Sequence, residues 1–154
     1  MARLRSNTPV LVQEECMKKR KLLIGFSLFN ATVNTVYLVR FFGILPPEEI
    51  VHGYVSWFMS FMLPNTFIAL SSWVLVISLL RKIYKVAMLS GLLLSGALIL
   101  HSLNGLTFGF YSGIWNTITF GTLFEMSVYV YGISLATFYI TQFWGVIRKY
   151  EGLY

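Results

Sequence analysis

Four long apolar runs, separated by short polar segments, dominate this chain of 154 residues. We place the runs at about 22–45, 55–80, 86–108 and 117–147. Each exceeds the roughly 20 residues that an α-helix needs to cross about 30 Å of hydrocarbon. The pattern therefore predicts an all-α, polytopic integral membrane protein that folds as a four-transmembrane-helix bundle.

The polar segments predict how these helices begin and end. Pro46 and Pro47, followed by two glutamates, indicate a stop and then a short interfacial helix at about 47–54. Pro64 lies inside the second run and is expected to kink it, because proline has no amide hydrogen to donate. Asn116 is expected to cap the amino end of the fourth helix.

The basic residues predict the orientation of the bundle. Eleven of the twelve Lys and Arg residues lie in three patches, at 3–21, 81–85 and 148–149. Because cytoplasmic loops carry the excess of Lys and Arg, all three patches are expected in the cytoplasm, with both termini. The predicted division is a basic cytoplasmic arm at 1–21, a transmembrane domain at 22–147 and a cytoplasmic tail at 148–154, in a multi-pass protein of the cell membrane.

The composition of the chain limits the classes of partner that we expect. Hydrophobic residues make up 56% of the chain and charged residues 12%, whereas soluble domains are roughly a quarter charged. The net charge is +6, but the charges flank apolar runs instead of forming one basic stripe, so nucleic acid is not an expected partner. The expected partners are membrane lipids, with a homo-oligomer, a larger membrane complex and a small apolar or amphipathic ligand left open.

Motifs for metal or cofactor chemistry are not found. The single cysteine, Cys16, excludes an internal disulfide and leaves open whether this thiol is modified. The sequence has no Cys/His ligand cluster, no glycine-rich phosphate loop and no serine-centred elbow. We therefore expect neither a metal nor a cofactor.

Polar residues inside the runs are the candidate functional residues, because burying them in hydrocarbon is costly. With a rise of about 1.5 Å per residue, members from all four helices fall at one level in the outer half of the membrane. We expect them to line the polar end of a ligand site, with aromatic residues as its apolar walls. The polar set is Arg40, Asn65, His101, Asn104 and Glu125, and the aromatic set is Phe58, Phe61, Phe108 and Tyr129.

Each candidate also has a structural alternative. Asn30, Asn34 and Asn65 have the chemistry of interhelical hydrogen-bonding residues, and Arg40 is close enough to the interface to snorkel outward. The small residues of a stripe on the third helix are expected to pack against a neighbouring helix or a second copy of the chain. This stripe is Ala87, Gly91 and Ser95.

Four functions are compatible with this pattern. The leading hypothesis is an integral membrane protein that binds a small amphipathic or lipid-like ligand in an outer-half intramembrane cavity. The alternatives are a proton-coupled small transporter or channel subunit with Glu125 titrating, and a structural or accessory subunit of a membrane complex. An intramembrane enzyme is the least favoured alternative. It would need His101 and Glu125 within about 3 Å of each other as an acid/base pair.

Overall fold

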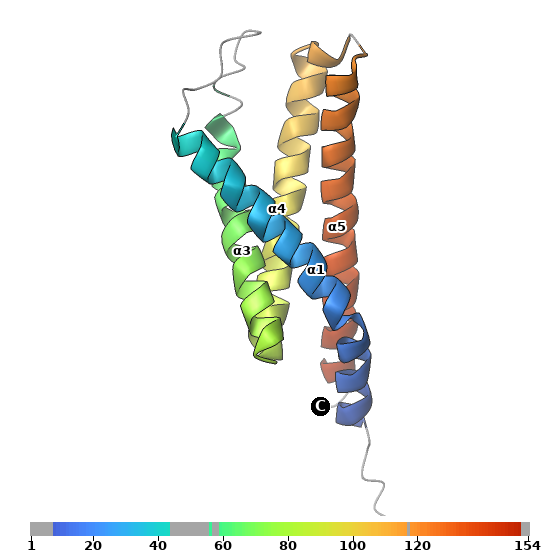
Figure 1. Cartoon of the computed structure of the whole chain (residues 1–154). Helices are drawn as coiled ribbons and strands as arrows, with labels where there is room; N and C mark the ends of the chain where they lie inside the picture. Colours follow the sequence, from blue (N-terminus) through green and yellow to red (C-terminus); the bar gives the residue numbers. More distant parts are fainter. Residues whose placement is uncertain (1–7, 44–55, 57–58, 117, 152–154) are drawn as a thin grey trace, which may run out of the picture.

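A computed structural model describes residues 8–43, 56, 59–116 and 118–151, and within these ranges every regular element is helical. Side chains are described for residues 20–39, 56, 59–116 and 118–144. The all-α prediction is confirmed for this part of the chain. The elements are α1 (Thr8–Gly43), α3 (Met62–Leu80), α4 (Tyr84–Tyr111), the short 3-10 helix η1 (Ile114–Asn116) and α5 (Phe120–Glu151) (Figure 1).

Four of these helices contain stretches long and apolar enough to cross a membrane: Arg20–Val39, Met62–Leu80, Tyr84–Tyr111 and Phe120–Trp144. Large apolar side chains are exposed on their outward faces, including Val39, Leu63 and Phe124. Such a surface is suited to lipid and would be unfavourable in water. The structure thus supports the prediction of a multi-pass membrane protein with four spans.

Helix α1 begins earlier than the predicted first span. It starts at Thr8 and continues without a break through the basic residues of the arm at 1–21. Its 36 residues correspond to a length of about 54 Å, well beyond the hydrocarbon thickness. The first turns of α1 therefore extend past the span Arg20–Val39. The predicted interfacial helix at 47–54 lies outside the described residues.

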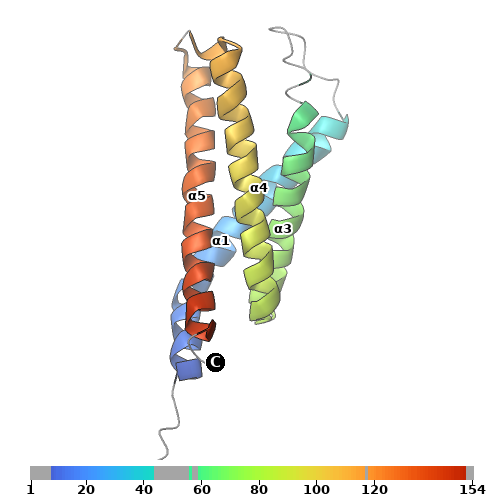
Figure 2. The same cartoon turned by 180° about the vertical axis from the view of Figure 1, so that it is seen from behind.

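The helices α3, α4 and α5 run alternately up and down, and α1 crosses them obliquely (Figures 1 and 2). The start of α1, the end of α5 and the turn between α3 and α4 lie at the same end of the bundle. We call this the basic end, because Arg20, Arg81, Lys82 and Lys85 lie there. The end that carries η1 is called the distal end.

The α3–α4 turn at the basic end is a Schellman motif. The amide of Ile83 donates to the carbonyl of Ser78 at 2.8 Å, and the amide of Lys82 donates to that of Leu79 at 3.2 Å. Lys82 adopts the left-handed conformation that this motif requires, with φ 59°. The motif satisfies carbonyls at the end of α3 and reverses the chain at once, so α3 and α4 are antiparallel neighbours.

The helical path is interrupted near Pro64, where the sequence predicts a kink. Residues 59–60 are helical, Phe61 is a turn residue, and α3 begins at Met62, so Pro64 lies in the first turn of α3, where its missing amide costs little. The start of the fourth span differs from expectation. The fourth span is capped by Thr119 and not by Asn116, which closes η1. The hydroxyl of Thr119 accepts from the amide of Thr122 at 3.2 Å, and the amide of Thr119 donates to the hydroxyl of Thr122 at 2.8 Å. This reciprocal arrangement has the geometry of a capping box.

Helix α1 packs mainly on α3, where Trp73 Nε1 donates to the hydroxyl of Thr35 at 3.1 Å. It reaches α5 where the Ser27 and Tyr139 hydroxyls hydrogen-bond at 2.9 Å, in a fully buried position. Asn30, expected to bond between helices, forms a side-chain hydrogen bond with Tyr131 of α5, and its Nδ2 also donates to the carbonyl of Phe26 within α1.

Glycines on α4 let aromatic side chains approach its backbone. A Cβ added at Gly91 would overlap the ring of Phe143, one at Gly105 the ring of Tyr129, and one at Gly109 the indole of Trp115. Ala87 and Ser95 are each 1% exposed. The predicted small-residue stripe therefore packs against a neighbouring helix, α5, through Gly91. We call the contacts of Gly91, Gly105 and Gly109 the glycine–aromatic seam.

The seam predicts that adding one methyl group to α4 has opposite effects at two glycines. Gly105→Ala should lower the free energy of unfolding by about 1–3 kcal/mol, because the methyl overlaps the Tyr129 ring. Gly96→Ala meets nothing within 4 Å and should be neutral or stabilising by up to about 1 kcal/mol, from helix propensity. Unfolding by denaturant in detergent measures both. Equal effects at the two sites, or an undiminished cost of Gly105→Ala in a Tyr129→Ala background, would contradict the seam.

Candidate functional site

Four aromatic side chains, from α4, η1, α5 and the turn before α3, meet near the distal end. The ring of His101 on α4 lies 4.7 Å from that of Phe61 and 5.9 Å from that of Tyr129, measured between centroids. Trp115 of η1 contacts Tyr129 at 6.1 Å. Phe61 and Tyr129 are nearly parallel, 6.4 Å apart. We call Phe61, His101, Trp115 and Tyr129 the distal aromatic cluster.

This cluster unites three of the residues predicted from sequence, Phe61, His101 and Tyr129, and adds Trp115. Trp115 is 8% exposed and seated against Gly109. Trp115 is not among the candidate residues named from the sequence. The available signal was the spacing of His101, Gly105 and Gly109 at intervals of four, which puts one aromatic and two glycines on a single face of α4.

Two polar atoms in the cluster are buried without a hydrogen-bond partner in the described part of the chain, His101 Nδ1 and Trp115 Nε1. The imidazole is thus enclosed by rings instead of paired with a carboxylate. No hydrogen bond or ion pair joins His101 to Glu125 among the described residues. The arrangement therefore supplies no contact for the hypothesis of an acid/base enzyme.

Glu125 lies closer to the helix end than its sequence position suggested. Helix α5 begins at Phe120, so Glu125 is about 8 Å along it, whereas counting from Thr117 gave about 12 Å. Its side chain is half-buried, and within the described ranges it makes no hydrogen bond or ion pair. At this depth a carboxylate can reach the hydrated headgroup region.

The remaining predicted residues are described by their position and exposure. Asn65 is 3% exposed, in the first turn of α3. Phe108 is half-buried in the last turns of α4. Arg40 lies in α1, but its side chain is outside the described set, and Phe58 is outside the described residues altogether. In the described ranges, no three His, Cys, Asp or Glu side chains gather as metal ligands would.

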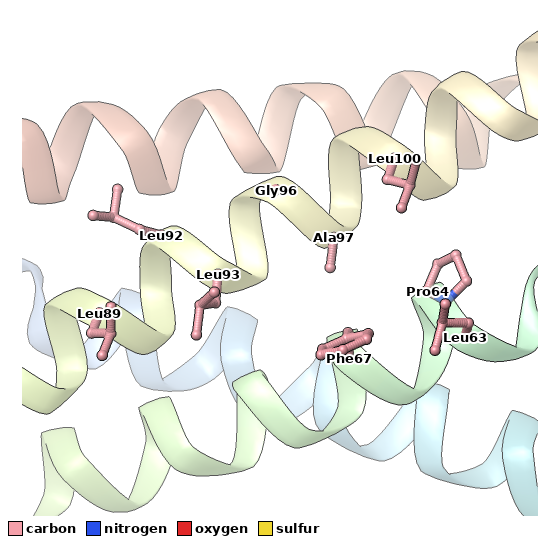
Figure 3. A pocket seen from close by; sticks show the side chains of 9 residues that line it. All are labelled: Leu63, Pro64, Phe67, Leu89, Leu92, Leu93, Gly96, Ala97 and Leu100. Carbon is pink, nitrogen blue, oxygen red and sulfur yellow. The ribbon is translucent and has the colours of Figure 1, made fainter.

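An apolar groove lies between α3 and α4 and was not predicted from the sequence. Its volume is about 400 Å³, within the range of roughly 300–1,000 Å³ typical of small-molecule sites. In Figure 3 the side chains of Leu89, Leu93, Ala97 and Leu100 lie on the side of α4 that faces α3, with α1 and α5 behind the two helices. The lining is Leu63, Pro64, Phe67, Leu89, Leu92, Leu93, Gly96, Ala97 and Leu100. We call it the α3–α4 groove.

Small residues in the middle of α4 create the space. Gly96 and Ala97 interrupt a leucine-rich segment, and a Cβ built on Gly96 would meet no atom within 4 Å. Leu89, Leu93 and Leu100 form the raised wall on the same helix, and Phe67 faces them from α3. The groove is open on its outward side, so a ligand would enter it from the lipid.

A polar pair lies beyond the distal end of the groove, outside its lining. Asn104 is one turn beyond Leu100 on α4, and Ser60 is two residues before the start of α3 at Met62. The Asn104 side-chain amide donates to the Ser60 hydroxyl at 2.7 Å. Asn104 is thus one helical turn from the groove lining, and Asn65 directly follows the lining residue Pro64.

The fold and the span lengths define a multi-pass α-helical membrane protein. Comparison with protein-family models found no match, and comparisons with curated proteins and with solved structures found none either. The functional argument therefore depends on the geometry of the chain itself.

His101→Phe is expected to leave the protein folded and to keep or raise its free energy of unfolding by up to about 2 kcal/mol. The substitution retains ring contacts with Phe61 and Tyr129 and removes a buried polar atom that has no partner. His101→Ala, in contrast, should cost about 3 kcal/mol because it leaves a cavity in the cluster. Unfolding curves in detergent compare them. A loss above about 1 kcal/mol in His101→Phe would show that the imidazole makes an essential polar contact.

Proposed function

We propose that this protein binds a lipid-like amphipathic molecule in the α3–α4 groove, with the apolar chain of the ligand along the groove and its polar group beside Asn104 and Ser60. The observation that supports this proposal is the juxtaposition of an open apolar groove of about 400 Å³ with a hydrogen-bonded polar pair at one end. Such a combination of mostly apolar walls and a few polar groups is typical of small-molecule sites.

The chemistry of the groove selects for an amphipath over a wholly polar or wholly apolar ligand. From Leu89 to Leu100 the groove follows α4 for about 17 Å, a length suited to an alkyl chain. The Asn104 amide and Ser60 hydroxyl both donate and accept hydrogen bonds, so they can pair with a ligand hydroxyl, ester or carboxylate. A ligand without a polar group would forgo these bonds.

The proposal also includes the orientation of the bundle in the membrane. The positive-inside rule places the basic end, with both termini, in the cytoplasm of a cell membrane. The polar end of the groove then lies in the opposite leaflet. The ligand would accordingly be taken from, and released to, the non-cytoplasmic half of the bilayer.

Filling the groove should abolish binding without disturbing the fold. We expect Gly96→Leu to weaken binding of a fluorescent long-chain fatty acid by at least about tenfold, equivalent to about 1.4 kcal/mol, because the new side chain occupies the space above Gly96. Gly25→Leu on α1 is the matched control, since a Cβ there also meets nothing within 4 Å. Fluorescence anisotropy of the detergent-solubilised protein measures the affinity. Equal affinity in the two variants would refute the groove as the binding site.

A second candidate function, proton-coupled transport, is favoured by one observation. Glu125 carries a half-buried carboxylate in a candidate span and has no ion-pair partner in the described part of the chain. A titratable group in that position suits a proton carrier.

Glu125→Gln separates the two functions. The groove is formed by α3 and α4 and does not include Glu125, so this variant should bind the fluorescent fatty acid within about threefold of the unmodified protein. In proteoliposomes that enclose a pH indicator, the variant and the unmodified protein should behave alike. A proton flux that depends on Glu125 would instead establish transport.

A further inference from the structure

The two halves of the α3–α4 groove have different walls. In the half nearer the basic end, every lining residue is a leucine within residues 89–93 of α4. We call it the leucine half. The half nearer the distal end has leucines only at its limit, and its other lining residues are small or cyclic. We call it the flat half, and its small or cyclic residues are Pro64, Phe67, Gly96 and Ala97.

The flat half combines a floor without projecting side chains and a wall that carries a planar ring. A Cβ built on Gly96 would meet no atom within 4 Å, and the side chain of Ala97 is a single methyl group. Phe67 lies thirteen residues before the end of α3 and Ala97 thirteen after the start of α4, so the two are at one level. Figure 3 shows the Ala97 side chain directed toward Phe67. Phe67 is 51% exposed, so a ligand in the groove can contact its ring.

Inside a membrane, a groove of this kind favours a rigid ligand. Lipid tails are as apolar as leucine, so a ligand gains no hydrophobic free energy by leaving the lipid for the groove. Its affinity must come from close packing, from hydrogen bonds and from a small loss of conformational freedom. A flexible alkyl chain loses rotational freedom when it is fixed along a helix, whereas a fused-ring body has almost none to lose.

The dimensions of the groove fit a fused-ring alcohol with a short tail. The flat half extends about 10 Å along α4, from Leu93 to Leu100, and four fused carbon rings are also about 10 Å long. The leucine half, from Leu89 to Leu93, adds about 6 Å for an alkyl tail. Asn104 lies one turn beyond Leu100 and donates to the Ser60 hydroxyl. Its amide carries a second N–H and a carbonyl oxygen that suit a single ligand hydroxyl.

We propose that the preferred ligand of the α3–α4 groove is a lipid of the sterol type. Its fused rings lie over Gly96 and Ala97 against the ring of Phe67, its hydroxyl is directed toward Asn104, and its alkyl tail occupies the leucine half. The inference rests on the proposed function, because it assigns a ligand class to the same groove. A fatty acid occupies this groove with lower affinity, since its chain is flexible.

The test measures equilibrium binding of radiolabelled cholesterol and of radiolabelled octadecanol to the full chain in maltoside detergent, at equal mole fractions. Each ligand has one hydroxyl, but only cholesterol has a rigid body. Cholesterol should bind at least about tenfold more tightly than octadecanol. Cholestane, which has the rings without the hydroxyl, should displace cholesterol at least about fivefold less well than unlabelled cholesterol does.

Substitutions in the flat half separate ring packing from general effects on the bundle. Phe67→Leu should weaken cholesterol binding by at least about tenfold and octadecanol binding by less than about threefold, because only the rigid body depends on a planar wall. Phe124→Leu is the matched control, the same exchange at an exposed phenylalanine of α5 outside the groove lining, and should change neither by more than about twofold. Gly96→Ala, which is expected to fold normally, should weaken cholesterol binding by at least about fivefold because its methyl group raises the floor.

The outcomes distinguish this proposal from the proposed function. Octadecanol binding as tight as that of cholesterol, or equal losses of both ligands in Phe67→Leu, would overturn the sterol proposal. The proposed function would stand in that case if Gly96→Leu still abolishes binding of the fluorescent fatty acid and Gly25→Leu does not. Unchanged binding of both cholesterol and the fatty acid in Gly96→Leu would show that the groove is not a binding site, and both proposals would fail.

Discussion

The close approach of aromatic rings to the backbone of α4 is the constraint on which the rest of the structure depends. Inside a membrane, helices are not driven together by exclusion of water, so association relies on tight packing and on hydrogen bonds. Gly91, Gly105 and Gly109 let Phe143, Tyr129 and Trp115 sit directly on the helix. These contacts fix α5 and η1 against α4 along most of its length. They also position His101 and Phe61 in the distal aromatic cluster.

Because the glycine face of α4 is directed toward α5, a different face of α4 packs against α3. On that face no side chain covers Gly96, and the α3–α4 groove lies beside Gly96 and Ala97. Glycines on α4 thus have two different surroundings. Gly91, Gly105 and Gly109 are covered by aromatic rings, whereas Gly96 lies at the open α3–α4 groove. The Asn104–Ser60 hydrogen bond lies beyond the distal end of that groove.

Much of the fold could be predicted from the sequence, since hydrophobic run length determines spans almost by itself. The positions where the helices begin and end were harder to predict. Thr119 instead of Asn116 caps α5, because a hydroxyl and the amide three residues on can bond reciprocally, and no composition rule favours one candidate over the other. Because α5 begins at Phe120 and not at Thr117, Glu125 lies closer to the start of the helix than expected. Its depth was calculated by counting residues from the helix start, so an error in the start is an equal error in the depth.

The candidate site was predictable only in part. Helical facing put Phe61, His101 and Tyr129 among the candidates, and these three rings contact one another. That they bind a ligand stays a prediction. No sequence pattern identified the groove, because a groove is defined by missing side-chain volume between two helices. Gly96 and Ala97 are unremarkable in the sequence until Phe67 and Pro64 are known to face them.

The most direct test of the account is to map where a photoactivatable fatty acid attaches to the unmodified protein in lipid nanodiscs. Peptide mass spectrometry after irradiation locates the attachment sites. The account predicts labels concentrated on residues 63–67 of α3 and 89–100 of α4, with saturation at low probe concentration. Labels spread evenly over the exposed apolar faces of α1, α3, α4 and α5, rising in proportion to the probe, would show that the groove is ordinary lipid-facing surface.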